Sequence, residues 1–169
     1  MDAPPKDLDA GEPVLVSACL LGHPCRYDDS HNRDPVLEED LALRGLRAVP
    51  FCPEEHGGLG TPRPAAWIES SGAAAVLDGR DRVLTEAGVD VTEAFLRGAR
   101  GALATCREHG IRRALLKERS PSCGVRNTHA GGRLVDGRGV TAEFLRRNAV
   151  EIEGIQGRRS TTGESPSTA

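Results

Sequence analysis

The stretch PVLVSA at residues 13–18 is a short apolar run that ends directly before Cys19. A continuous apolar run of this length is typical of a strand buried on both faces, as in a parallel sheet. Residues 46–52 (LRAVPFC) and 111–116 (IRRALL) have the same character. Pro50 lacks a backbone N–H, so the second run is expected at a kink or at the edge of the sheet. These three runs predict the strands on which the fold is built.

Helical patterns lie between the apolar runs. Residues 35–45 (PVLEEDLALRG) have helical spacing, with Asp34 as the expected N-cap and a proline in the first turn. A longer helix is predicted from 90–92 (DVT) to 109–110 (HG), and Cys106 falls on its apolar face. Shorter elements are expected as strands over 73–77 and 150–152 and as a helix over 140–148. The alternation predicts an α/β fold, a single three-layer domain with a mostly parallel, Rossmann-like sheet flanked by helices.

The length of 169 residues suits one domain, which we place at residues 13–156. Residues 1–12 are acidic and contain prolines, and they are expected to form a flexible lead. Residues 157–169 (GRRSTTGESPSTA) are polar and rich in Ser and Thr, which predicts a disordered tail. The chain has no apolar run near the ~20 residues of a membrane span and no signal-peptide pattern at its start. A cytoplasmic protein without a membrane partner is therefore expected.

Composition limits the class of partner further. The formal net charge is -3, and aromatic residues make up 3% of the chain. Proteins that bind nucleic acids are usually basic, and single-strand binders use several stacking aromatic side chains. The composition therefore argues against a nucleic acid as the partner.

Three cysteines stand close to the ends of the predicted strands. Cys19 follows the first strand, Cys52 ends the second, and Cys123 lies shortly after the third. The carboxyl ends of parallel strands meet at one edge of the sheet, where ligands bind, so we expect the three cysteines to gather there. In a reducing compartment, cysteines more often serve metal binding or catalysis than disulfides. The spacing alone does not decide between a metal site and buried thiols, because no close Cys-x-x-Cys pair typical of structural zinc is present.

Five stretches carry a family resemblance, in this order: VSACLLGHPCRYD at 16–28, HNRDP at 31–35, PFCPEEHGGLGTPRP at 50–64, DGRD at 78–81 with VTEAFLRGA at 91–99, and LLKERSPSCGV at 115–125. Together they span most of the predicted domain. The sequence resembles a bacterial family of thiouracil desulfidases that was formerly a domain of unknown function.

The resemblance implies a 4Fe-4S cluster held by Cys19, Cys52 and Cys123. It leaves out Cys25, whose position varies in the family, and Cys106, which lies outside the motifs. With three protein ligands, one iron keeps an open position that suits a soft substrate sulfur. The implied activity is a non-redox, hydrolase-like desulfuration, in which a small thiolated nucleobase or nucleoside such as 2-thiouracil exchanges C=S for C=O and sulfide is released.

The loops supply candidates for the remaining roles. A carboxylate must activate the attacking water, and Glu54 is the first choice, with Asp28 and Glu118 as alternatives. Ser120 is expected to donate a hydrogen bond to the cluster or the substrate. The side chains expected to bind substrate or to balance charge are Arg26, Lys117, Ser122, Arg63 and His31.

These residues also have structural interpretations. Glu54 would suit a helix N-cap or a partner for Arg63, while Asp28 and Glu118 would suit partners for Arg26 and Lys117. For the protein as a whole, the alternative to an enzyme is a metal-binding interaction module without catalysis. A thiol enzyme is a further alternative, with Cys19 or Cys123 as the nucleophile and His129 as the base closest in sequence to Cys123.

Overall fold

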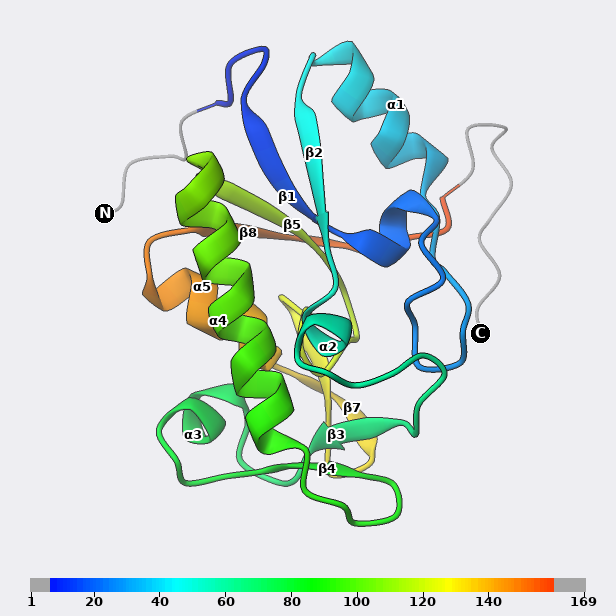
Figure 1. Cartoon of the computed structure of the whole chain (residues 1–169), viewed down its shortest axis with the longest axis vertical. Coiled ribbons are helices and arrows are strands. Elements are labelled where there is room, and N and C mark those ends of the chain that lie inside the picture. The colour runs from blue at the N-terminus through cyan, green and yellow to red at the C-terminus, as the bar shows by residue number, and fades with distance from the viewer. Residues whose placement is uncertain (1–6, 160–169) are drawn as a thin grey trace.

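A computed structural model describes residues 7–159, which contain two four-stranded sheets (Figure 1). The strands of the first sheet, in spatial order, are β2 (Arg47–Phe51), β1 (Pro13–Ser17), β5 (Arg113–Lys117) and β8 (Glu151–Ile155). All neighbouring strands in this sheet are parallel. The three apolar runs and the short strand expected over 150–152 are thus confirmed as strands. β2 lies at the edge of the sheet, where the missing N–H of Pro50 is tolerated.

Helices cover both faces of the parallel sheet. They are α1 (Pro35–Leu43), α4 (Thr92–His109) and α5 (Val140–Arg147). On one face, Leu37 and Leu41 of α1 belong to the same buried cluster as Val16 of β1. On the other face, α4 and α5 pack against the sheet, and Cys106 of α4 joins Leu15 of β1 in the core. The predicted three-layer α/β arrangement is confirmed.

Short-range sequence signals explain where these helices begin and end. Oδ1 of Asp34 accepts a hydrogen bond of 3.1 Å from the backbone N–H of Leu37, and Pro35 occupies the first turn of α1. The helix α4 ends at Gly110, which adopts the left-handed conformation with φ 67°. Cys106 is 1% exposed, as expected from its place on the apolar face of α4.

The second sheet was not predicted from the sequence. Its strands, in spatial order, are β4 (Val83–Thr85), β3 (Ala66–Ile68), β6 (Asn127–Ala130) and β7 (Arg133–Asp136). Only the pair β3–β6 is parallel among the described strands of this sheet. The sheet packs on the first half of α4 through Ile68, Val83 and Phe95. It therefore extends the core beyond the parallel sheet.

The strand predicted over residues 73–77 is wrong. These residues form the short helix α3 (Ala73–Leu77). The run reads AAAVL, and alanine has the highest helix propensity of all residues. A five-residue apolar run has no periodicity that separates a buried strand from a buried helical turn.

The carboxyl ends of the parallel strands all lie at one edge of the first sheet. Ser17 is in register with Phe51, and Lys117 is in register with Ile155. Two short helical segments, η1 (Ala18–Leu21) and α2 (Pro53–His56), follow β1 and β2 directly. This edge therefore receives the segments that carry Cys19, Cys52 and Cys123.

The predicted lead and tail lie partly outside the described residues, which exclude 1–6 and 160–169. Within the described part, Leu8 packs against the core, and Nε of Arg159 lies 2.7 Å from Oδ2 of the buried Asp34. Among residues 7–159, none of the helices combines the length and apolar character needed to cross a membrane.

Candidate metal centre

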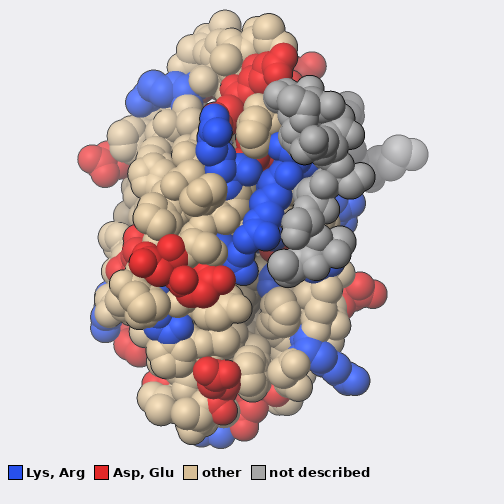
Figure 2. Space-filling view, turned by 90° about the vertical axis from the view of Figure 1, so that its right-hand side faces the viewer, with Lys and Arg blue, Asp and Glu red and all other residues tan. Residues whose placement is uncertain are grey.

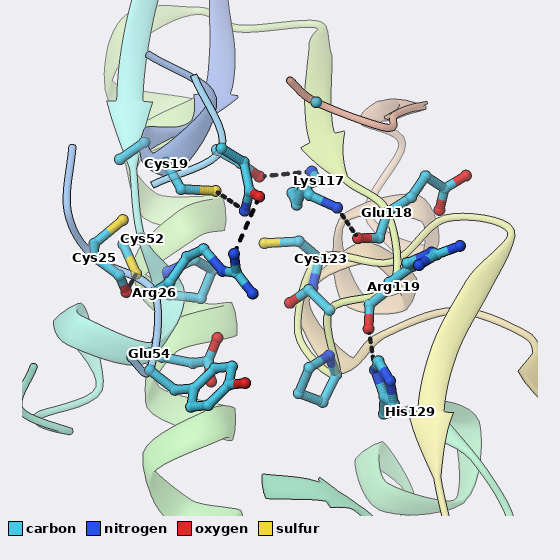
Figure 3. A pocket seen from close by; sticks show the side chains of 18 of the residues that line it. Cys19, Cys25, Arg26, Cys52, Glu54, Lys117, Glu118, Arg119, Cys123 and His129 are labelled. Atoms are coloured by element: carbon cyan, nitrogen blue, oxygen red, sulfur yellow. Dashed lines mark hydrogen bonds between the residues drawn. The ribbon is translucent and has the colours of Figure 1, made fainter. Parts of the chain in front are cut away.

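A cavity of about 520 Å³ opens at the carboxyl edge of the parallel sheet (Figure 3). Four cysteines line it: Cys19, Cys25, Cys52 and Cys123. They come from the segments that follow β1, β2 and β5, so residues distant in sequence meet in one place. This edge therefore brings together Cys19, Cys52 and Cys123, as predicted from their positions after three parallel strands.

Cys19 lies in η1 and is 9% exposed. A hydrogen bond from Cys25 lowers its pKa to about 7 against the effect of burial, with further help from Asn32, Lys117 and Arg26. The amide Nδ2 of Asn32 donates to Sγ of Cys19 at 3.7 Å. These contacts favour the thiolate, which is the form that binds metals.

Cys52 and Cys123 approach the cavity from two other segments. Cys52 is the N-cap of α2, and a hydrogen bond from Cys25 holds its pKa below the ordinary value. Cys123 is buried, and burial raises its pKa to about 12. In Figure 3 the sulfur atoms of Cys19 and Cys123 both point into the cavity. Because the raised pKa keeps the thiol of Cys123 protonated, metal binding there would release a proton.

The remaining two cysteines have different surroundings. The thiol of Cys25 is within hydrogen-bonding reach of both Cys19 and Cys52, and these bonds raise its pKa. Cys106 lies in the core between α4 and the sheet, and burial raises its pKa to about 11. Cys25 therefore belongs to the cavity, while Cys106 packs in the core.

Glu54 is the carboxylate that faces both the cavity and the Cys123 segment. Its side chain is 16% exposed, and burial raises its pKa. Ser122 donates a hydrogen bond of 3.2 Å to Oε2, and Nε of Arg63 lies 3.6 Å from Oε1. This Nε is buried and has no hydrogen-bond partner in the described structure. Glu54 thus lies beside Arg63, as expected for a partner of that residue. It also lines the cavity, as expected for a catalytic base.

The other two candidate carboxylates are placed differently. Asp28 is exposed, binds the backbone and hydroxyl of Ser30, and is not among the residues that line the cavity. Glu118 lines the cavity, but its side chain is fully buried, and Oε1 accepts hydrogen bonds from the backbone N–H groups of Val125 and Arg126 at 2.7 and 2.9 Å. Glu118 therefore fastens the loop that carries Cys123.

The two serines of that loop form a small network. Oγ of Ser120 accepts hydrogen bonds from the backbone N–H groups of Ser122 and Cys123 at 3.2 and 3.0 Å. The hydroxyls of Ser120 and Ser122 lie 3.1 Å apart. Ser120 lines the cavity, whereas Ser122 is fully buried. The network shapes the turn and also connects it to Glu54.

Positively charged side chains gather around the cavity. The Lys and Arg residues that line it are Arg26, Arg63, Lys117, Arg119 and Arg158. Figure 2 shows Lys and Arg side chains forming a band across one face of the molecule. Burial lowers the pKa of Lys117, and repulsion from Arg26, Arg119 and Arg158 acts in the same direction. This concentration of positive charge suits a site that holds negative charge.

Asn32 is a site residue that sequence reasoning missed, and it lies beside one that was chosen. His31 is exposed, and its Nδ1 accepts a hydrogen bond from the backbone of Arg33 at 3.1 Å. Its neighbour Asn32 is 6% exposed, lines the cavity and contacts Cys19. Because both residues lie in the HNRDP motif, the motif itself was the signal, and only the three-dimensional structure shows which side chain points inward.

Comparisons with known proteins give matches that cover most of the chain. The family model described as 2-thiouracil desulfurase matches residues 14–154. The uncharacterised protein YbbK of Bacillus subtilis (strain 168) is 39% identical over 142 residues, which cover 82% of this chain and 93% of that protein. The solved structure of the 4Fe-4S-dependent thiouracil desulfidase TudS matches with a TM-score of 0.72 and 44% identity. That match covers 85% of this chain and 90% of the TudS chain.

Proposed function

Since the chain belongs to the 2-thiouracil desulfurase family, we propose that it replaces the sulfur of a thiolated nucleobase such as 2-thiouracil by oxygen and releases sulfide. The observation that carries this proposal is the meeting of Cys19, Cys52 and Cys123 around one cavity. TudS, which is 44% identical to this chain over the matched region, is a 4Fe-4S-dependent enzyme. We assign the same cofactor to this chain, with these three cysteines as its ligands.

The residues around the cavity fit such a cluster. Thiolates are the usual protein ligands of iron–sulfur clusters. Three thiols from three separate segments suit a cofactor that offers several irons in different directions. Thiolates and cluster sulfides bring negative charge, and the cations that line the cavity, including Arg26 and Lys117, balance it. When bound, a cluster with three protein ligands for four irons supplies a Lewis-acidic iron with an affinity for sulfur.

Glu54 is the residue that we assign to proton transfer. Its raised pKa, caused by burial, brings the carboxyl closer to neutral pH, where a general base works best. It accepts a proton from water as the water oxygen bonds to the thiocarbonyl carbon, and the C–S bond then breaks. The sulfur takes the proton held by Glu54 and leaves as hydrosulfide, while the second proton of the water passes from the new carbonyl oxygen to solvent. Thiocarbonyl and water therefore become carbonyl and hydrogen sulfide, without an external oxidant or reductant.

The neighbouring polar side chains position Glu54 and the substrate. Ser122 fixes Oε2 of Glu54, and Ser120 lines the cavity beside Cys123. Arg26, Lys117 and Arg63 offer N–H donors to the ring carbonyl and ring nitrogen atoms of the base. The cavity volume of about 520 Å³ lies within the range of small-molecule sites, and the cluster and the base would share it.

The test is anaerobic reconstitution with iron and sulfide, followed by incubation with 2-thiouracil. The proposal predicts that the reconstituted protein forms uracil and sulfide in equal amounts and that the metal-free protein forms neither. Desulfuration by the metal-free protein would support a thiol enzyme instead. A stable cluster without any turnover of thiolated bases or nucleosides would support a metal-binding module and would overturn the proposal.

A further inference from the structure

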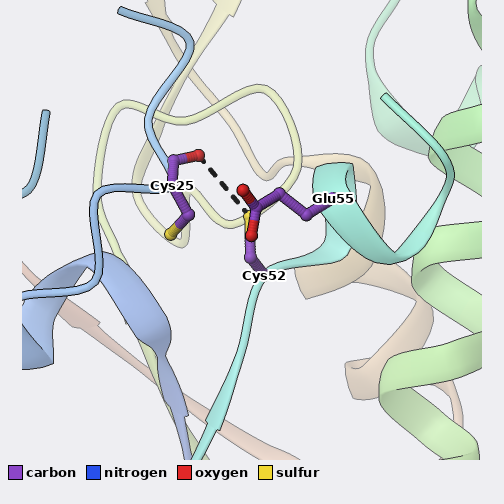
Figure 4. Close-up of side chains that lie close together, drawn as sticks. All are labelled: Cys25, Cys52 and Glu55. Carbon is purple, nitrogen blue, oxygen red and sulfur yellow. Dashed lines mark hydrogen bonds between the residues drawn. The ribbon is translucent and has the colours of Figure 1, made fainter. Parts of the chain in front are cut away.

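Cys25 forms part of a second group of ligand atoms, which differs from the three proposed cluster ligands. One ligand atom each from Cys25, Cys52 and Glu55 lies within 4.8 Å of the other two (Figure 4). Cys25 comes from the loop after η1, whereas Cys52 and Glu55 belong to the first turn of α2. Residues three positions apart lie on the same side of a helix, so Cys52 and Glu55 face Cys25 together.

The short distances in this group suit one metal ion. Ligands of a single tetrahedral ion bind it at about 2.0–2.3 Å and therefore lie close to one another. Cysteines that bind different corners of a cubane cluster are farther apart, because each binds a separate iron. Cys25 and Cys52 also contact each other directly, since Sγ of Cys52 lies 3.7 Å from the carbonyl oxygen of Cys25. The pair is therefore better placed to share one ion than to bind two irons.

The three side chains are held in place and accessible from one side. Nη2 of Arg63 donates a hydrogen bond of 2.8 Å to the carbonyl oxygen of Cys25, which fixes that loop beside α2. The hydroxyl of Thr61 donates to Oε2 of Glu55. Cys25 is 4% exposed, whereas Glu55 is exposed to solvent. An ion can thus enter from the Glu55 side and reach the sulfur atoms of the half-buried Cys52 and the buried Cys25.

We propose that the cluster-free protein binds one soft divalent cation, with Zn²⁺ as the best match, through Cys25, Cys52 and Glu55. Two thiolates and a carboxylate are ligand types that zinc accepts, and water completes the fourth position. Because Cys52 is also a proposed cluster ligand, the single ion and the cluster exclude each other. Zinc at this site blocks cluster assembly.

The binding site is tested with Co²⁺, whose bonds to thiolates absorb in the near ultraviolet. Reduced, metal-free full-length protein is titrated anaerobically, and the wild type is expected to bind one ion per chain. Cys25→Ala and Glu55→Gln should each weaken binding more than about tenfold, because each removes a direct ligand. Cys106→Ala is the matched control and should titrate like the wild type. Since Glu55 is exposed, its variant tests the site even if Cys25→Ala folds poorly. Wild-type affinity in the Cys25→Ala or Glu55→Gln protein would overturn the proposal.

Competition with the cluster is tested by adding one equivalent of Zn²⁺ before anaerobic reconstitution. The visible absorbance of the cluster should then fail to develop in the wild type. Cys25→Ala retains all three proposed cluster ligands, so it should assemble the cluster whether zinc is present or not. Equal inhibition of the wild type and Cys25→Ala by zinc, or no inhibition of the wild type, would contradict mutual exclusion.

Discussion

The hydroxyl of Ser122 donates a hydrogen bond of 3.2 Å to Oε2 of Glu54, although the two residues are 68 positions apart. Ser122 precedes Cys123, and Glu54 follows Cys52 by two residues. The bond therefore joins two of the three segments that carry the proposed cluster ligands. It also sets the direction in which the carboxylate of Glu54 faces the cavity.

Replacement of Glu54 tests its assignment as the base. Glu54→Gln keeps the shape of the side chain but cannot accept the proton, so kcat for desulfuration of 2-thiouracil should fall by about 10² to 10⁴-fold. The iron content after reconstitution should stay at the wild-type value. Glu39→Gln, an exposed carboxylate on α1, is the control and should leave kcat unchanged. Near-wild-type kcat in Glu54→Gln would remove Glu54 from the mechanism.

Replacement of Ser122 tests the positioning role. Ser122→Ala removes one hydrogen bond to Glu54, a loss worth about 1 kcal/mol, which corresponds to roughly a fivefold decrease in kcat. KM should change little, because Ser122 is fully buried and does not line the cavity. The measurement is steady-state kinetics on the reconstituted protein. A rise in KM with an unchanged kcat would show that Ser122 binds substrate instead.

The approach of α2 to α4 depends on glycine. A Cβ at Gly98 of α4 would clash with the backbone of Pro53 at the start of α2. We expect Gly98→Ala to lower the free energy of unfolding by about 1–3 kcal/mol, because neither backbone can move without disturbing the core. Gly60→Ala is the matched control, since a Cβ there meets no atom within 4 Å. Chemical denaturation measures both variants, and equal stability of the two would contradict this account of the packing.

Glu118 should make stability depend on pH. Burial raises its pKa, but hydrogen bonds from Arg126 and Val125 outweigh burial and hold the pKa below the ordinary value of 4.5. The ionised form is therefore stabilised in the folded protein. This contribution is present above pH 4.5 and is lost as the pH falls through the lower, folded-state pKa.

Comparison with Glu118→Gln isolates that contribution. At neutral pH the variant should be less stable by about 1–3 kcal/mol, because the buried hydrogen bonds are weakened. The difference should shrink as the carboxyl of the wild type becomes protonated. Denaturation midpoints across the acid range provide the measurement. Parallel stability curves for the two proteins would show that Glu118 is not ionised in the folded state.

Three strands of the parallel sheet could be predicted because each lies in a mainly apolar run that is followed by a cysteine-bearing segment. The second sheet could not, since β3 and β4 have only three residues each and β6 and β7 mix polar with apolar residues. Residues 73–77 were assigned to the wrong element because an alanine-rich apolar run suits both a buried strand and a helix.

The location of the site could likewise be predicted, while the orientation of individual side chains could not. Parallel strand order brings Cys19, Cys52 and Cys123 to one edge. Nothing in the motif HNRDP indicates that Asn32 points inward and His31 outward. The role of Glu118 in fastening its own loop depends on contacts with Val125 and Arg126 that form only when the loop folds back.

The most direct test of the account is the iron and acid-labile sulfide content of five reconstituted variants, in each of which one cysteine is replaced by alanine. We predict that Cys19→Ala, Cys52→Ala and Cys123→Ala lose the cluster and that Cys25→Ala and Cys106→Ala retain wild-type amounts. A full cluster in any of the first three, or its loss in either of the last two, would contradict the proposed ligand set.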